Sequence, residues 1–79
     1  MKTKEEVLEE IQLIFRDVFK DENLMINFAS NSNSISGWDS ITNILLIDKI
    51  EENFNIEFPI DVIYESEKIE DWINFILRN

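Results

Sequence analysis

Cysteine and histidine are both absent from the sequence. Without cysteine the chain forms no disulfide and has no thiolate of its own. Without histidine it lacks the commonest general base and the commonest metal ligand of proteins. A single glycine and a single proline among 79 residues leave little room for loops or linkers. These absences argue against nucleophilic catalysis and against a metal site.

Basic residues are scarce, since seven Lys and Arg stand against 17 Asp and Glu for a formal net charge of −10. Such a surface repels the phosphates of nucleic acids and anionic lipid headgroups, so we expect neither as a partner. A basic patch on another protein is the partner that this charge favours. Ten of the acids and only two bases, Lys49 and Lys68, lie within residues 39–71, where we expect that partner to dock.

Long apolar runs are missing as well, because no segment approaches the ~20 apolar residues needed to cross a bilayer. The N-terminal segment MKTKEEVLEE is charged and has no apolar signal-peptide core. The sequence therefore predicts no membrane span and a cytoplasmic location. With 79 residues and 44% hydrophobic composition, it predicts one domain over residues 1–79 with enough apolar side chains for a core, and we expect a monomer.

Apolar residues recur at helical spacing before residue 20 and again after residue 39. Thr3 and Glu6 have the spacing of a capping box, which predicts a helix that starts there and fades near residues 20–22. Asp39 is a strong N-cap type, and Ser40 then takes the first position of a second helix that ends near residues 53–55. The predicted core stripes are Val7, Ile11, Ile14, Phe15 and Val18 in the first helix and Ile41, Ile44, Ile47, Ile50 and Phe54 in the second.

The rest of the chain is predicted from turn residues and short apolar patterns. Residues 21–37 form a long connection rich in Asn and Ser. Pro59 is expected to open a brief helical turn, and Ser66 to cap a last helix. The side chains expected to pin the loop onto the core are Leu24, Met25, Ile26 and Phe28, and the stripe of the last helix is Ile69, Trp72, Ile73 and Ile76. The sequence thus predicts an all-α fold with three longer helices, one short helix and a long first loop. A small α+β fold with a hairpin over residues 56–64 is the alternative.

The catalytic potential of the chain is small. The carboxylates lie mainly on the polar sides of helices, where a solvated face is the ordinary explanation, and no two of them form an obvious acid–base pair. Ser40 has no histidine to take its proton, and Lys49 lies too far along the helix to replace one. We therefore expect no enzyme. The triplet Asp39-Ser40-Ile41 is by itself too short to assign a function.

Residues 37–59 read GWDSITNILLIDKIEENFNIEFP, and this segment resembles the core signature of acyl and peptidyl carrier proteins. In that family an Asp-Ser-Leu-like triplet opens the second helix, and a Glu-Glu-x-Phe element and an apolar-x-apolar-Pro exit follow. The corresponding elements here are Asp39-Ser40-Ile41, Glu51-Glu52-Asn53-Phe54 and Ile56-Glu57-Phe58-Pro59. The family pattern also matches the later apolar residues through Phe75, the length of the chain, its acidity and its long first loop. The resemblance therefore covers essentially the whole chain.

The resemblance implies a four-helix bundle of the acyl-carrier type, which carries acyl groups without catalysing a reaction. A separate phosphopantetheinyl transferase would attach a 4′-phosphopantetheine arm from coenzyme A to the Ser40 hydroxyl. The backbone amides and positive dipole of the helix start are expected to tolerate the incoming phosphodiester. Asp39 would cap the helix and help the transferase recognise the site. The other implied partners are an acyl-loading ligase or acyltransferase and downstream synthase or transferase enzymes with basic docking surfaces.

Two further sets of residues receive expected roles. We expect partners to bind the second helix through Ile41, Leu45, Asp48, Glu51 and Glu52. By the resemblance, an acyl chain would enter between the second and third helices, or the residues there only fill the core. The candidates for that acyl pocket are Ile44, Leu46, Ile47, Ile63 and Tyr64. Trp38 either packs the loop against the helix or flanks the arm.

Two departures from primary fatty-acid carriers narrow the prediction. Those carriers usually have a small residue in place of Trp38 and an acid in place of Leu45. The chain is therefore more similar to specialised carriers that serve surface polysaccharides, modified acyl or aminoacyl groups, or secondary metabolites. An unmodified acidic helical adaptor that binds a basic protein surface is the alternative function. The cargo, the loading enzyme and the pathway stay open.

Overall fold

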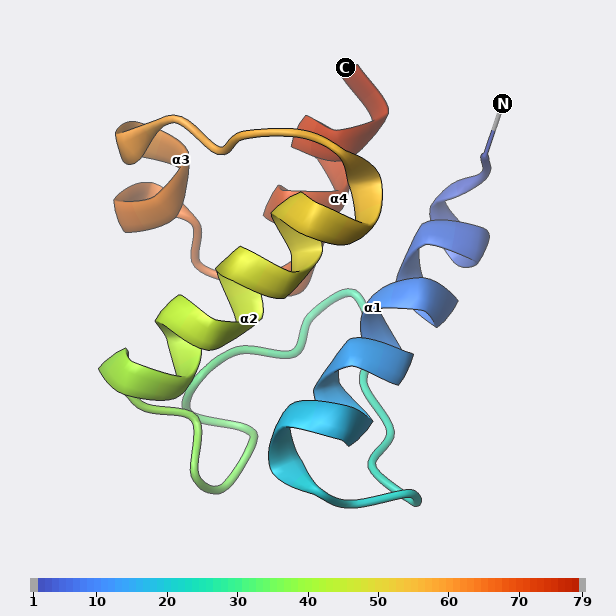
Figure 1. The fold of residues 1–79 in the computed structure, drawn as a ribbon, viewed down its shortest axis with the longest axis vertical. Coiled ribbons are helices and arrows are strands. Elements are labelled where there is room, and N and C mark those ends of the chain that lie inside the picture. The colour runs from blue at the N-terminus through green and yellow to red at the C-terminus, as the bar shows by residue number, and fades with distance from the viewer. Residues whose placement is uncertain (1, 79) are drawn as a thin grey trace.

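The computed structural model describes residues 2–78, and every regular element within them is a helix (Figure 1). The helices are α1 (Lys4–Phe19), α2 (Ser40–Phe54), α3 (Ile60–Glu65) and α4 (Ile69–Arg78). In the view of Figure 1, α2 lies between α1 and the short α3. The predicted all-α fold with a long first loop is confirmed, and the alternative with a hairpin over residues 56–64 is wrong.

The predicted capping box at the start of α1 is present. The Thr3 hydroxyl accepts a hydrogen bond from the Glu6 amide at 3.1 Å, and the Glu6 carboxylate accepts one from the Thr3 amide at 2.8 Å. These hydrogen bonds satisfy two amides that the helix start otherwise leaves unpaired, and they lower the pKa of Glu6. At the other end the chain leaves the helix through Lys20, whose φ of 55° is left-handed.

The core is assembled from one face of each longer helix. The fully or nearly buried residues are Val7, Ile11 and Phe15 of α1, Leu46, Ile47 and Ile50 of α2, Ile69, Trp72, Ile73 and Ile76 of α4, and Ile26, Ile35 and Phe58 between the helices. The predicted stripe of α4 is confirmed in full. In α1 the predicted residues Ile14 and Val18 are half-buried and pack against this core.

The predicted core stripe of α2 is wrong in its first half, since Ile41 is 71% exposed and Ile44 is 61% exposed. Residues three apart on an α-helix are displaced by about 60° around its axis, because each residue turns by about 100°. A series at constant spacing of three therefore winds around the helix, and Ile41 lies on the side opposite Ile50. The apolar residues of α2 occupy more than one side, so spacing alone does not orient this helix.

The connection between α1 and α2 is fixed to the start of α4. The Ile69 amide donates to the Ser30 carbonyl and the Glu70 amide to the Phe28 carbonyl, both at 3.0 Å. Ile26 is buried as predicted, whereas Met25 is 71% exposed and does not pin the loop. These hydrogen bonds satisfy first-turn amides of α4 and tie the loop to the rest of the molecule.

The prediction that Ser66 caps the last helix is wrong. Its hydroxyl instead donates to the Val62 carbonyl at 2.5 Å, which closes the last turn of α3. The Asp71 carboxylate accepts hydrogen bonds from the amides of Glu67 and Lys68, at 2.8 and 3.2 Å. The start of α4 is thus held by a carboxylate within the helix and by loop carbonyls. Pro59 does introduce a short helix, as predicted, and stands at its N-cap.

Replacement of Ile50 tests the assigned orientation of α2. Ile50→Ala removes a fully buried side chain, so it should lower the free energy of unfolding by about 2–5 kcal/mol. Ile44→Ala is the control, because it changes the same residue type on the exposed side of the same helix. It should change the free energy of unfolding by only about 0.5 kcal/mol. Urea unfolding followed by circular dichroism measures both values. Equal losses in the two variants would contradict the orientation.

Candidate functional site

Ser40 is the first residue of α2, and its side chain is exposed. Asp39 precedes it as the N-cap, and its carboxylate accepts hydrogen bonds from the amides of Ile41 and Thr42, at 3.0 and 2.9 Å. The helix start is therefore where the sequence predicts it. Because the residues on both sides of Ser40 are held, its backbone presents the hydroxyl from a defined position.

Thr42 completes a capping box at this site, in the place where Glu or Gln is more usual. Its hydroxyl accepts a hydrogen bond from the Asp39 amide at 2.8 Å, and it lies 2.9 Å from the Gly37 carbonyl. Gly37 itself has a φ of +87°, which favours glycine. The pKa of Asp39 lies below its usual 3.8, chiefly through the hydrogen bonds from the Thr42 amide and hydroxyl. Asp39 therefore stays ionised well into acid.

The start of α2 is less positive than the sequence predicts, because free backbone amides and the positive end of the helix dipole were expected there. The amides of Ile41 and Thr42 are already paired with the Asp39 carboxylate, so they are not available to an incoming phosphate. The negative charge of Asp39 also offsets part of the positive end of the helix dipole. The helix start therefore holds Ser40 in an exposed position, but it attracts anions less than a helix start with free amides would.

Trp38 lies just before the cap, and its ring packs inward. The ring centroid is 5.1 Å from that of Phe15, in an edge-to-face arrangement, and 5.7 Å from that of Trp72. Its indole Nε1 donates to the Asn43 Oδ1 at 2.9 Å. Trp38 therefore packs the end of the loop against both α2 and the core, which is one of its two expected roles.

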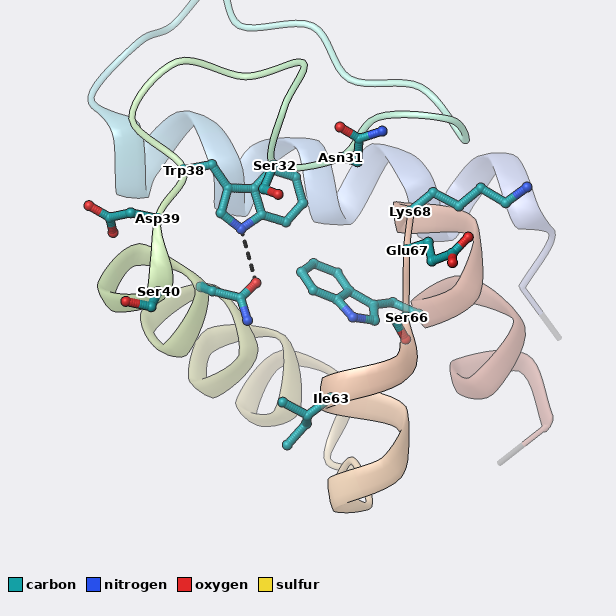
Figure 2. A pocket seen from close by; sticks show the side chains of 11 residues that line it. Asn31, Ser32, Trp38, Asp39, Ser40, Ile63, Ser66, Glu67 and Lys68 are labelled. Carbon is teal, nitrogen blue, oxygen red and sulfur yellow. Dashed lines mark hydrogen bonds between the residues drawn. The ribbon is translucent and has the colours of Figure 1, made fainter.

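A cavity of about 290 Å³ opens beside Ser40 (Figure 2). Its wall combines two indole rings and one aliphatic side chain with polar groups from the first loop, from α2 and from the connection between α3 and α4. The apolar part is Trp38, Trp72 and Ile63, and the polar part is Asn31, Ser32, Asp39, Ser40, Asn43 and residues 66–68. In Figure 2, Ser40 and Asp39 stand on one side of this space, and Ser66, Glu67 and Lys68 on another.

Trp72 lines this cavity, but its indole N–H is sealed from it. The residue is 4% exposed, and its Nε1 is buried without a hydrogen-bond partner among residues 2–78. An unpaired buried donor costs about 1–3 kcal/mol, so a native protein rarely keeps one without a reason.

The five candidates for an acyl pocket do not gather around this cavity. Leu46 and Ile47 belong to the core, whereas Ile44 and Tyr64 are 61% and 82% exposed. Ile63 alone of the five lines the cavity. Sequence reasoning missed Asn43 and Trp72 as wall residues. The signal for Asn43 was its position, because it precedes Ile47 by four residues and Ile50 by seven and so shares their inward face.

The five candidates for partner binding differ in their surroundings. Ile41 and Leu45 are 71% and 47% exposed, and Asp48 and Glu52 are exposed as well. Glu51 is half-buried, and its carboxylate accepts a hydrogen bond from the Phe58 amide at 2.7 Å. Glu51 therefore holds the connection to α3 in place and offers less free charge to a partner than its neighbours do.

Among residues 2–78, no three acidic side chains are grouped so that they could hold a metal ion. None of the four described helices combines the length and the apolar character needed to cross a bilayer.

Comparison with known proteins identifies the family. The model of the family described as "Phosphopantetheine attachment site" matches residues 9–76. The chain belongs to this family. The solution structure of a holo acyl carrier protein from Geobacter metallireducens is similar, with a TM-score of 0.83 and 25% sequence identity over 91% of this chain and 83% of that one. The comparison with curated proteins gave no match.

The protein is therefore a carrier of the acyl-carrier type and not an enzyme, and 4′-phosphopantetheine is its prosthetic group. Family membership decides in favour of the carrier over the unmodified adaptor. The residues present fit such a group. Ser40 offers an exposed hydroxyl at the edge of a cavity, and the wall of that cavity combines two indole rings with the polar side chains of Asn31, Ser32 and Asn43, which suits an arm of amides and short methylene segments.

Charge removal at the cap tests the role assigned to Asp39. A depressed pKa in the folded state contributes stability above the unfolded pKa, and this contribution is lost as the pH falls through the folded pKa. Asp39→Asn keeps a residue that can cap. It should lower the melting temperature at neutral pH, and the difference from wild type should shrink in acid.

Asp48→Asn is the matched control, because it removes one negative charge from an exposed position in the middle of α2. Thermal melts of the three proteins across acidic and neutral pH provide the measurement. The same pH-dependent difference in both variants would show that net charge, and not the cap, is responsible.

Proposed function

We propose that the 4′-phosphopantetheine arm is attached to the Ser40 hydroxyl. The observation that carries this proposal is the position of Ser40, exposed at the first residue of α2 and directly after a capped Asp39. Its hydroxyl has no hydrogen-bond partner among residues 2–78. By contrast, Ser30 is buried, and the hydroxyl of Ser66 is bonded to the Val62 carbonyl. Ser40 is thus free to react in a way that these two serines are not.

The residues of this chain would prepare the hydroxyl, and the transferase would perform the reaction. Asp39 and Thr42 hold the helix start, so that Ser40 enters the transferase in one conformation. The hydroxyl oxygen attacks the pantetheine-bearing phosphorus of coenzyme A and forms the phosphodiester bond, while the pyrophosphate bond of coenzyme A breaks and adenosine 3′,5′-bisphosphate leaves. The hydroxyl proton goes to a base that the transferase supplies, since this sequence has no histidine to take it. The arm, once bound, supplies the thiol that holds acyl groups as thioesters. We also propose that Asp39, which stays ionised, is recognised by the transferase.

We propose that partner enzymes dock on α2 beside Ser40. The docking surface consists of Ile41, Leu45, Asp48, Glu51 and Glu52. Ile41 and Leu45 are its exposed apolar part, and the three acids form the part farther along the helix. The best complement is therefore a partner surface with an apolar contact flanked by basic residues. A phosphopantetheinyl transferase, an acyl-loading ligase or acyltransferase, and downstream synthase or transferase enzymes are the proposed partners.

We further propose that this carrier serves a specialised pathway. Trp38 and Leu45 are the two residues that depart from primary fatty-acid carriers, and both lie close to Ser40 in the chain. Trp38 is built into the core and the cavity wall, so it is an integral part of the site. The chain is proposed to act as one monomeric domain over residues 1–79. A cytoplasmic location is proposed because the free thiol of the arm requires a reducing compartment.

Intact mass spectrometry tests the attachment. Incubation with coenzyme A and a broad-specificity transferase should add one phosphopantetheine mass to the wild type and none to Ser40→Ala. Ser32→Ala is the matched control, because Ser32 is an exposed serine that lines the same cavity, and it should be modified like the wild type. Modification of Ser40→Ala, or none of the wild type, would contradict the proposal.

The docking surface is tested by removing its most exposed apolar side chain. Burial of an isoleucine is worth about 1.5–3 kcal/mol, so Ile41→Ser should lower the kcat/KM of the transferase about tenfold or more. The melting temperature should change little, because Ile41 is 71% exposed. Leu77→Ser near the end of α4 is the control and should leave the rate unchanged. Equal rates for wild type and Ile41→Ser would exclude Ile41 from the surface.

A further inference from the structure

The rings of Trp38 and Trp72 close the inner side of the cavity beside Ser40. Behind them lies Phe15, which is fully buried and does not line the cavity. Its ring centroid is 5.1 Å from that of Trp38 and 6.5 Å from that of Trp72, and in Figure 2 the Trp38 ring lies beside α1, which carries Phe15. The hydrogen bond from Trp38 Nε1 to Asn43 Oδ1 holds the ring against α2. Trp38 is therefore a fixed partition between the cavity and the core.

The rest of the cavity offers little to a hydrocarbon chain. Among residues 2–78, Ile63 is the one apolar side chain in its wall besides the two indole rings, and the others are asparagine, serine and charged side chains. Methylene groups gain free energy where they leave water for apolar contact. An acyl tail would find such contact behind the indole rings, in the space that Trp38 fills.

We propose that Trp38 is a specificity-determining residue, which keeps the acyl tail of a cargo out of the interior of this carrier. The inference rests on the proposed attachment of the arm at Ser40, two residues after Trp38 in the wall of the same cavity. A short or polar acyl group loses nothing by this closure, because it has no long tail to shelter. A long acyl chain would stay in water until a partner enzyme takes it up. The cargo that suits this carrier is therefore a short or polar acyl group.

Removal of the Trp38 ring should open the partition. The space that the indole leaves would be continuous with the cavity, and the rings of Phe15 and Trp72 would line it. Apolar cavities made in this way bind small apolar groups. Trp38→Ala is thus expected to create the shelter that the wild type lacks. Phe19→Ala is the matched control, because Phe19 also packs on Phe15, with ring centroids 5.8 Å apart, but does not line this cavity.

The reactivity of the loaded thioester measures the shelter. Wild type, Trp38→Ala and Phe19→Ala are loaded from acetyl- or octanoyl-coenzyme A with a broad-specificity transferase, and intact mass spectrometry verifies the cargo. Cleavage by hydroxylamine is then compared with that of the same acyl group on free pantetheine. Wild type and Phe19→Ala should slow the cleavage of both acyl groups equally. Trp38→Ala should slow the cleavage of the octanoyl group about fivefold more than that of the acetyl group, because burial of several methylenes favours the sheltered tail.

Nuclear magnetic resonance locates the tail independently of its reactivity. In octanoyl-loaded Trp38→Ala, protons of the acyl chain should show nuclear Overhauser contacts to the Phe15 ring. The octanoyl-loaded wild type should show none. Trp38→Leu, which keeps more of the buried volume, takes the place of Trp38→Ala if circular dichroism shows that variant to be unfolded.

The possible failures are distinguishable. If the wild type takes up no arm, the proposed function fails and the inference fails with it. If the loaded wild type protects octanoyl more than acetyl, or shows contacts between the tail and Phe15, the inference alone is overturned. A folded variant of Trp38 that gives no shelter also overturns it. Equal shelter in Phe19→Ala would overturn it as well, because general loosening of the core would then be responsible.

Discussion

The hydrogen bonds between Asp39 and Thr42 fix the point at which the long loop becomes α2. Ser40 lies between the paired groups and is exposed at the first position of the helix. Trp38 lies on the other side of the cap and turns into the core, where it meets Phe15 and Trp72. One local capping arrangement thus directs neighbouring residues in opposite directions, the Ser40 hydroxyl outward and the Trp38 ring inward.

The site places polar groups where a small core would otherwise use apolar ones. Asn43 is on the inward face of α2 and lines the cavity, and Trp72 keeps a buried N–H without a partner among residues 2–78. Conversely, Ile41, Ile44 and Leu45 remain exposed on the outer side of the same helix. Both features cost stability or solubility in an unbound protein. With the arm on Ser40 as proposed, each would have a use, since the polar side chains would line the space beside the arm and the apolar exterior would be available to partner enzymes.

The sequence was sufficient for the fold because local signals agree along most of the chain. The capping boxes at Thr3 and Asp39, the stripes of α1 and α4 and the turn before α3 each depend on residues close together in sequence. The orientation of α2 did not follow from its pattern, because its apolar residues occupy more than one side. The start of α4 was also mispredicted, since Asp71 and two loop carbonyls hold it in place of Ser66.

The candidate site was only partly accessible to sequence reasoning. Ser40 and Asp39 are adjacent and recognisable by family resemblance, and the structure places them as expected at the helix start. The cavity is formed by the first loop, α2, α3 and α4, so its wall depends on contacts between distant segments. Asn43 can be recognised in the sequence as a polar residue on an apolar helix face. The unpaired Nε1 of Trp72, by contrast, is evident only in the packed structure.

Attachment at Ser40 is the claim on which the account depends most. Fragmentation mass spectrometry of the protein purified from its native host locates the modification directly. The account predicts that peptides containing Ser40 carry phosphopantetheine, with or without cargo, and that peptides containing the other serines carry none. An arm on another serine, or a native protein without an arm, would contradict it.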